Sequence, residues 1–194
     1  MNRAIELIGV LTASLLFGGA AFAGGPSAEM LAGACAACHG PGGISAGPAT
    51  PSIAGMTEEY LEFSMQDYKS DTRKSTVMNR IAKGYSDEEI KLIAKYYAGL
   101  KYASVNQEAE TSMVAKGDDL QKTYCDSCHE NNGAKADGIG ILAGQAMPYL
   151  DYTIADFQSG DRPMDRRKKQ KMDQLVRDAG EDGFHAIIQY YGSH

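Results

Sequence analysis

The chain carries the stretch Cys35-Ala36-Ala37-Cys38-His39, and the same pattern recurs ninety residues later as Cys125-Asp126-Ser127-Cys128-His129. The likeness between the two halves extends beyond these stretches. Ile53-Ala54-Gly55 matches Leu142-Ala143-Gly144, Tyr60-Leu61-Glu62-Phe63 matches Tyr149-Leu150-Asp151-Tyr152, and Tyr96-Tyr97 matches Tyr190-Tyr191. The offset shifts from 90 to 89 and then to 94, so one copy carries small insertions. Two copies of one domain account for the chain most simply.

The repeat also sets the expected domain boundaries. We expect a first domain over residues 24–100, a polar linker over 101–111 and a second domain over 112–194. Residues 1–23 have the build of a secretory signal peptide, with Arg3 before an apolar run from Leu7 to Phe17 and a small-x-small site at Ala21-Phe22-Ala23. The apolar run is shorter than the roughly 20 residues that a membrane-spanning helix needs. The sequence therefore predicts export to the periplasm and a mature chain without a membrane span.

The charge pattern narrows the class of partner. The formal net charge is −6, which argues against nucleic acid as a ligand. One basic run stands out against this balance, and it comprises Arg166, Arg167, Lys168, Lys169 and Lys171. Such a run is either a solvated helical face or a patch that steers an acidic redox partner.

Each copy is predicted to consist of helices joined by loops rich in glycine and proline. Ser27 and Thr57 are expected helix caps, and Ser86 with Glu89 forms a capping box. The final helix of each copy has one apolar face, formed by Ile90, Ile93, Ala94 and Tyr97 and by Phe184, Ile187, Ile188 and Tyr191. No convincing alternating strand pattern occurs, so the expected fold is all-α.

Cys-x-x-Cys-His is the attachment signature of c-type haem. Two thiols three positions apart reach the two vinyl groups of one macrocycle, and the adjacent histidine becomes the iron's proximal ligand. A thioredoxin-like redox pair or half of a zinc site is the alternative for a lone Cys-x-x-Cys. Two copies, each followed directly by histidine, favour two covalently bound haems. We expect Cys35, Cys38, Cys125 and Cys128 to attach them, with His39 and His129 as iron ligands.

The sixth iron ligand is expected to be methionine, because His/Met ligation raises the potential of an electron-transfer haem. Met78 is the candidate in the first copy, whereas Met56 and Met65 are expected to pack on the core or the haem edge. The second copy leaves two alternatives. The offset of 94 pairs Met172 with Met78, but Met172 lies on an apolar helical stripe, and Met164 follows Pro163 at the end of a loop.

A ligating imidazole needs a partner for its second nitrogen. A backbone carbonyl of Gly47-Pro48 is the expected acceptor for His39, and the corresponding loop of the second copy, Ala136-Asp137-Gly138, leaves that contact uncertain. His185 and His194 are expected at the surface.

The chain resembles the di-haem cytochrome subunit of flavocytochrome c sulfide dehydrogenase over essentially its whole mature length. In the first half the likeness is carried by Ala28-Glu29-Met30-Leu31, Cys35-Ala36-Ala37-Cys38-His39-Gly40, Gly47-Pro48-Ala49-Thr50-Pro51-Ser52-Ile53-Ala54 and Ser75-Thr76-Val77-Met78-Asn79-Arg80-Ile81-Ala82-Lys83-Gly84-Tyr85. In the second half it is carried by Ile141-Leu142-Ala143-Gly144-Gln145, Pro148-Tyr149-Leu150 and Arg162-Pro163-Met164.

The resemblance implies two tandem class I cytochrome c domains related by pseudo-twofold symmetry. It also implies a heterodimer with a periplasmic subunit that carries FAD and oxidises sulfide, and a soluble c-type cytochrome or similar acceptor downstream. The Arg-Pro-Met segment of this family favours Met164 as the second axial ligand, with Met172 as the alternative.

Three functions are compatible with these sequence features. The first is the electron-accepting subunit of a sulfide-oxidising flavocytochrome, with no acid, base or nucleophile chemistry of its own. The second is a free tandem di-haem shuttle that serves a terminal oxidase or reductase. The third is a di-haem peroxidase, which needs an iron with an open or displaceable site; two good methionine candidates weigh against it.

Overall fold

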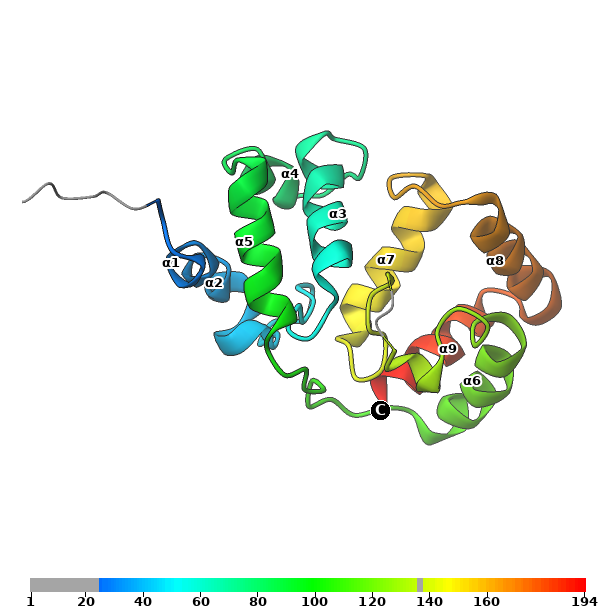
Figure 1. Ribbon diagram of the computed structural model, residues 1–194. Helices are drawn as coiled ribbons and strands as arrows, with labels where there is room; N and C mark the ends of the chain where they lie inside the picture. Colours follow the sequence, from blue (N-terminus) through cyan, green and yellow to red (C-terminus); the bar gives the residue numbers. More distant parts are fainter. Residues whose placement is uncertain (1–24, 136–137) are drawn as a thin grey trace, which may run out of the picture.

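The computed structural model describes residues 25–135 and 138–194, which form two helical lobes joined by an extended segment (Figure 1). The predicted signal peptide lies outside these residues. The first lobe contains α1 (Ala28–Gly33), α2 (Ala36–His39), α3 (Glu58–Lys69), α4 (Met78–Ala82) and α5 (Asp87–Ala98). The second lobe contains α6 (Thr111–Tyr124), α7 (Met147–Ser159), α8 (Arg166–Ala179) and α9 (Asp182–Gly192). Short 3-10 turns at Pro41–Gly43 and Asn131–Gly133 follow the two Cys-x-x-Cys-His motifs.

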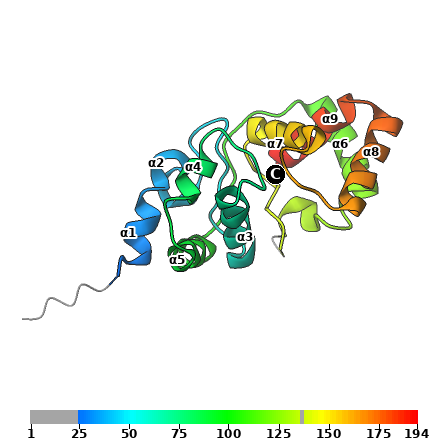
Figure 2. The same cartoon turned by 90° about the horizontal axis from the view of Figure 1, so that it is seen from above.

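The two lobes remain separate when the molecule is turned (Figure 2). No strand occurs within the described ranges, as the sequence predicted. Among the described helices, none is long and apolar enough to cross a membrane. The segment joining the lobes has no regular secondary structure from residue 101 to residue 110, and α6 begins at Thr111.

Three helices begin where the sequence predicted. The Ser27 hydroxyl accepts a hydrogen bond from the N–H of Met30, and the Thr57 hydroxyl accepts one from Tyr60. At α5 both halves of the capping box form: the Ser86 hydroxyl accepts from the N–H of Glu89 at 3.2 Å, and the Glu89 carboxylate accepts from the N–H of Ser86 at 2.7 Å. Each cap satisfies backbone donors that a helix N-terminus otherwise leaves unpaired.

Each lobe is built around one buried tyrosine of its final helix. Tyr97 in α5 and Tyr191 in α9 are each only 2% exposed. The ring of each tyrosine packs directly on a glycine of the loop that follows the haem motif, where a Cβ on Gly43 or Gly133 would lie 2.7 Å from the ring. The carbonyls of these tyrosines accept hydrogen bonds from the N–H groups of Gly55 and Gly144. The two copies seen in the sequence therefore have the same core packing.

The lobes differ mainly before their last helices. In the first lobe α4 has five residues, whereas α8 in the second lobe has fourteen. This difference explains why the offset between the copies grows from 89 to 94. The longer α8 packs against α6 and α9, and its Leu175 is buried in the second core.

Candidate haem sites

The first Cys-x-x-Cys-His motif forms one turn of helix that directs His39 inward. Cys35 caps α2 and is half-buried, Cys38 is exposed, and the buried His39 is the last residue of that helix. The His39 ring donates from Nδ1 to the Pro51 carbonyl at 2.8 Å, because a carbonyl oxygen can only accept. This bond leaves Nε2 as the ring nitrogen available to a metal. Burial lowers the pKa of His39, so the ring is neutral at neutral pH.

The acceptor for His39 is therefore Pro51, and the expectation of a Gly47-Pro48 carbonyl was wrong. The Gly47 carbonyl instead accepts a hydrogen bond from the Ser45 hydroxyl at 2.8 Å. The physical reason is that this turn folds back on itself, so that the chain first reaches the His39 ring three residues after Pro48.

The second motif has the same backbone geometry but a different environment at its histidine. The N–H of His129 bonds to the carbonyl of Cys125 at 2.9 Å, as His39 bonds to Cys35. Nδ1 of His129 is buried, and within the described ranges it has no hydrogen-bond partner. In the loop after this motif, Ala136-Asp137-Gly138, residues 136 and 137 lie outside the described residues. Burial, with smaller effects of Lys168 and Arg162, lowers the pKa of His129 to about 4, which keeps this ring neutral.

The cysteine chemistry fits thioether attachment better than a redox pair. All four thiols are free. Burial raises the pKa of Cys35, and it raises the pKa of Cys125 to about 11. Thioredoxin-like pairs depend on a lowered thiol pKa, since the thiolate is the reactive species. Cys35 and Cys125 lack that activation, and a thiol pair followed directly by a buried histidine is the arrangement to which haem c attaches.

The methionines divide into core residues and residues free of the core. Met56 is buried in the first core, as the sequence predicted. Met172 packs against the second core from α8. Met78 is the first residue of α4, and Met164 lies just before Asp165, the N-cap of α8; both are only partly buried. Because Met172 has a packing role, Met164 stays our expected second ligand, and Met78 stays the first.

A cluster of arginines and tyrosines lies between the lobes, and sequence reasoning missed it. Arg73, 4% exposed, donates to the Tyr149 hydroxyl at 3.3 Å, and Arg162 donates to the Tyr60 hydroxyl at 3.2 Å. Burial raises the pKa of Tyr149, but Arg73 and Arg162 together outweigh this effect and lower it to about 8. The Nε of Arg73 is buried and has no partner in the described part of the chain. A buried guanidinium with a free donor, as in Arg73, suits a haem propionate.

A signal for this cluster was present in the sequence. Ser70-Asp71-Thr72-Arg73 and Ser159-Gly160-Asp161-Arg162 stand at the offset of 89 that also relates Tyr60 to Tyr149. Extending the repeat alignment by ten residues would have paired the two arginines. It would not have shown that each arginine binds the tyrosine of the other lobe.

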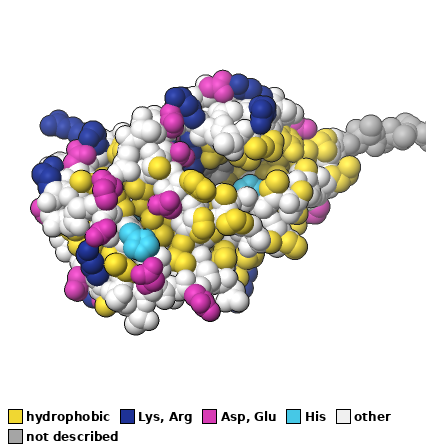
Figure 3. All heavy atoms as spheres, turned by 180° about the vertical axis from the view of Figure 1, so that it is seen from behind, with side chains coloured by type: hydrophobic (Ala, Val, Ile, Leu, Met, Phe, Trp, Pro, Cys, Tyr) yellow, Lys and Arg dark blue, Asp and Glu magenta, His cyan; other side chains and the backbone are white. Residues whose placement is uncertain are grey.

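The remaining charged features lie at the surface. His185 and His194 are exposed, as expected, with His194 bonded to the Tyr190 carbonyl. The basic run forms the first turns of α8, where Lys168 stacks over Phe157 and Lys169 pairs with Asp173. Seen from behind, apolar side chains gather across the middle of the molecule, and basic side chains lie mostly along its rim (Figure 3).

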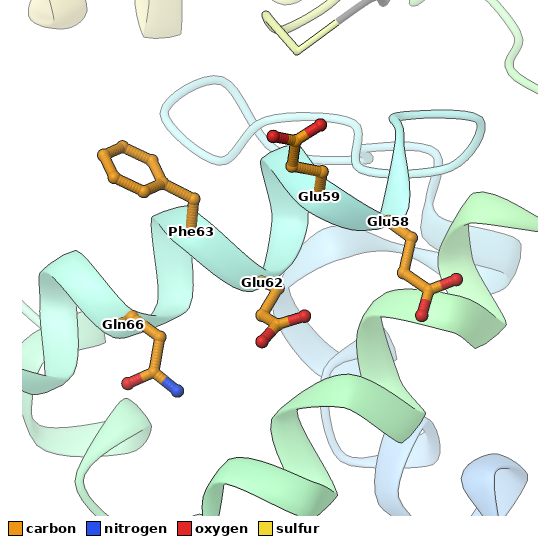
Figure 4. A pocket seen from close by; sticks show the side chains of 5 residues that line it. All are labelled: Glu58, Glu59, Glu62, Phe63 and Gln66. Carbon is orange, nitrogen blue, oxygen red and sulfur yellow. The ribbon is translucent and has the colours of Figure 1, made fainter.

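A shallow hollow on α3 is unrelated to the haem motifs. It is lined by Glu58, Glu59, Glu62, Phe63 and Gln66. Glu59 and Phe63 project to one side of the helix, and Glu58, Glu62 and Gln66 project to the other (Figure 4). Acidic side chains of this kind do not hold a haem iron, and we assign this surface no role in the sites.

An all-α fold with one Cys-x-x-Cys-His motif in each of two like lobes defines a tandem c-type cytochrome. Residues 27–101 match the family model for cytochrome c. The chain is 33% identical to cytochrome c4 of Pseudomonas aeruginosa, over 82% of this chain and 85% of that protein. It is 50% identical to the cytochrome subunit of sulfide dehydrogenase of Chlorobaculum tepidum, over 37% of this chain and 64% of that protein.

The crystal structure of reduced recombinant cytochrome c4 from Pseudomonas stutzeri superposes with a TM-score of 0.72 at 26% identity, covering 87% of this chain and 99% of that one. The chain belongs to the di-haem cytochrome c family of the cytochrome c4 type. It is an electron-transfer protein whose cofactor is covalently bound haem c.

Proposed function

We propose that this chain is the periplasmic di-haem subunit that accepts electrons from an FAD-containing sulfide dehydrogenase subunit and passes them to a soluble acceptor such as a c-type cytochrome. The observation that supports the proposal is the 50% identity to a sulfide dehydrogenase cytochrome subunit over 72 residues, compared with 33% identity to cytochrome c4 over 172 residues. FAD belongs to the partner, and this chain supplies only haem.

In this proposal each lobe holds one haem with four residues. Cys35 and Cys38 would attach the first haem, and His39 and Met78 would bind its iron. Cys125, Cys128, His129 and Met164 would hold the second haem in the same way. When bound, each haem supplies a one-electron change at its iron.

The protein's own residues keep the free-energy cost of that one-electron change low. The Pro51 carbonyl fixes the orientation of the His39 ring, and burial excludes water from it. A rigid, shielded pair of axial ligands rearranges little when an electron arrives, and ligand type with burial sets the potential. Arg73 and Arg162, held by tyrosines of the opposite lobe, supply positive charge where the lobes meet.

Mild purification from the native periplasm, followed by absorption spectra before and after sulfide, tests the proposal. We expect flavin absorbance from a co-purifying subunit and reduction of both haems by sulfide. Thiosulfate at the same concentration is the control donor. A haem protein that carries no flavin and stays oxidised with sulfide would contradict the assignment.

A free di-haem shuttle is the second candidate, because the relatives that match most of the chain include cytochromes c4 as well as electron acceptors of thiosulfate dehydrogenase. The same preparation separates the two functions. A shuttle elutes alone at the size of the single chain and exchanges electrons with a terminal oxidase or reductase. A dehydrogenase subunit elutes together with the flavoprotein.

A further inference from the structure

Gln145 and Met56 occupy equivalent places in the two lobes and reach across the boundary in opposite directions. Each follows an Ala-Gly pair, and they stand 89 residues apart. The Gln145 Oε1 accepts a hydrogen bond from the N–H of Ser52 at 2.8 Å, and the Met56 Sδ accepts one from the N–H of Ile141 at 3.1 Å. Ser52 and Ile141 are themselves equivalent at the same offset. The contact is thus reciprocal, as pseudo-twofold symmetry requires.

Of the two contacts, the one between Gln145 and Ser52 is stronger than the one between Met56 and Ile141. Its side-chain amide also donates from Nε2 to the Ser52 carbonyl at 3.0 Å, so that it clamps both backbone groups of one residue. Gln145 is 1% exposed and Ser52 is 0% exposed. Buried amide hydrogen bonds of this kind are costly to lose, since the unpaired groups cannot turn to water. A thioether, by contrast, is only a weak acceptor.

The peptide group that Gln145 holds is the one that binds the His39 ring. Nδ1 of His39 donates to the Pro51 carbonyl, and the Ser52 N–H that donates to Gln145 belongs to the same planar peptide unit. The three groups form a chain of hydrogen bonds through one amide. Such chains polarise their members, so the bond at Ser52 strengthens the bond at His39.

The second lobe lacks this chain. The residue equivalent to Pro51 is Gly140, and the N–H of the next residue, Ile141, donates to the Met56 sulfur. His129 Nδ1 has no partner within residues 25–135 and 138–194. Within the described residues the two histidines therefore differ. His39 is hydrogen-bonded to a peptide group that the opposite lobe holds, and His129 is not.

We propose that Gln145 is a positioning residue for His39: from the second lobe it sets the hydrogen bond that orients the axial ligand in the first. This rests on the proposed role of His39 as a haem ligand. A stronger bond at Nδ1 makes the imidazole a better donor to iron and stabilises the oxidised form. Docking of the second lobe thereby lowers the potential of the first haem.

Gln145→Leu in the full-length holoprotein tests this, with Gln189→Leu as the matched control. Gln189 is also buried, and its amide oxygen accepts a backbone N–H, that of Glu110, without contact with Ser52. Two quantities are measured: the potentials of both haems, each assigned by NMR contacts to its own lobe, and the solvent exchange of the His39 Nδ1 proton in the reduced protein.

We expect Gln145→Leu to raise the potential of the first haem. At a fixed applied potential, the ratio of oxidised to reduced haem should fall about threefold to tenfold, and a tenfold change corresponds to 59 mV for one electron. The His39 Nδ1 proton should exchange faster, and the second haem should keep its potential. Gln189→Leu should leave both haem potentials unchanged.

Three results would overturn the inference: unchanged potential and exchange in Gln145→Leu, equal shifts of both haems, or the same shift in Gln189→Leu. If Gln145→Leu does not fold, Gln145→Met replaces it, because Met56 shows that a sulfur is accommodated at the equivalent place. A smaller upward shift is then expected, and no shift overturns the inference. The titration uses no sulfide and no flavoprotein, so it can fail while the proposed function stands.

Discussion

Met78 is the proposed methionine ligand of the first haem, and its removal tests that assignment directly. Met78→Ala removes the thioether from the start of α4 and should abolish the weak Met–Fe charge-transfer band of one oxidised haem. The potential of that haem should fall, because methionine ligation raises it. Met65→Ala, on α3, is the control and should retain both bands. A full-intensity band in Met78→Ala would show that another group ligates the iron.

The second haem gives a paired prediction. Met164→Ala should remove the charge-transfer band of that haem. Met172→Ala should retain the band and cost about 1–2 kcal/mol, because Met172 packs against the second core. Oxidised spectra and urea unfolding of both variants measure these effects. The reverse pattern would make Met172 the ligand and Met164 a packing residue.

At this scale the sequence predicts haem-attaching and ligating residues, but it does not indicate the residues that support them. Cys-x-x-Cys-His is local, and its chemistry follows from spacing alone. The acceptor for His39 is a backbone carbonyl, which no side-chain pattern marks, and it proved to be Pro51. In the sequence, Gln145 is a polar residue beside a turn like any other. Its role follows from the fold, which places Ser52 of the opposite lobe against its amide.

Among the elements, α5 packs closely on the loop after the haem motif. Gly43 has φ of +77°, and a Cβ there would lie 2.7 Å from the Tyr97 ring. Gly43→Ala should cost about 2–4 kcal/mol, from backbone strain and overpacking together. Gly42→Ala is the matched control: φ is +64°, but no atom lies within 4 Å of its Cβ.

For Gly42→Ala we expect about 1–2 kcal/mol, the cost of a left-handed backbone alone. Guanidinium unfolding of both variants measures the difference between strain and steric overlap. Equal losses for the two substitutions would mean that the Tyr97 ring can move aside, and that its packing does not constrain the loop.

Helix positions could be predicted because caps and apolar faces are local signals. Ser27, Thr57 and Ser86 cap as expected, and the faces of α5 and α9 are buried as their periodicity indicated. The length of α8 could not be foreseen from the first copy, because the insertion that extends it interrupts the alignment there. The offset of 94 pairs Met172 with Met78, but in the longer α8 Met172 packs against the second core.

At the scale of the whole molecule, the repeat predicted two lobes but not how they meet. Helix-to-helix packing is almost confined to each lobe. The boundary includes reciprocal contacts between single residues: Gln145 with Ser52, Met56 with Ile141, and the two Arg–Tyr pairs. Lys74 also binds Asp161, and Ile141 and Ala143 are buried in the first core. Such contacts carry no periodicity. They become visible only when the two copies are placed face to face.

The Arg–Tyr pairs give a prediction about cooperativity between the lobes. Tyr60 accepts from Arg162 and Tyr149 accepts from Arg73, so Tyr60→Phe and Tyr149→Phe together remove both bonds while keeping the rings. Hydrogen bonds to charged groups contribute about 1.5–3 kcal/mol each. We expect the parent holoprotein to unfold in one calorimetric transition and the double variant to unfold in two, because the lobes lose part of their coupling.

The control for this experiment is Tyr152→Phe, since Tyr152 is 57% exposed on α7. It should unfold as the parent protein does. Each single variant should lie between the parent and the double variant, and the two should be alike, because the pairs are equivalent at the offset of 89. A double variant that keeps one transition at the parent temperature would mean that the remaining contacts between the lobes, those of Gln145, Met56 and Lys74 among them, are enough to couple them. The arginines would then serve the haem propionates and not the association of the two halves.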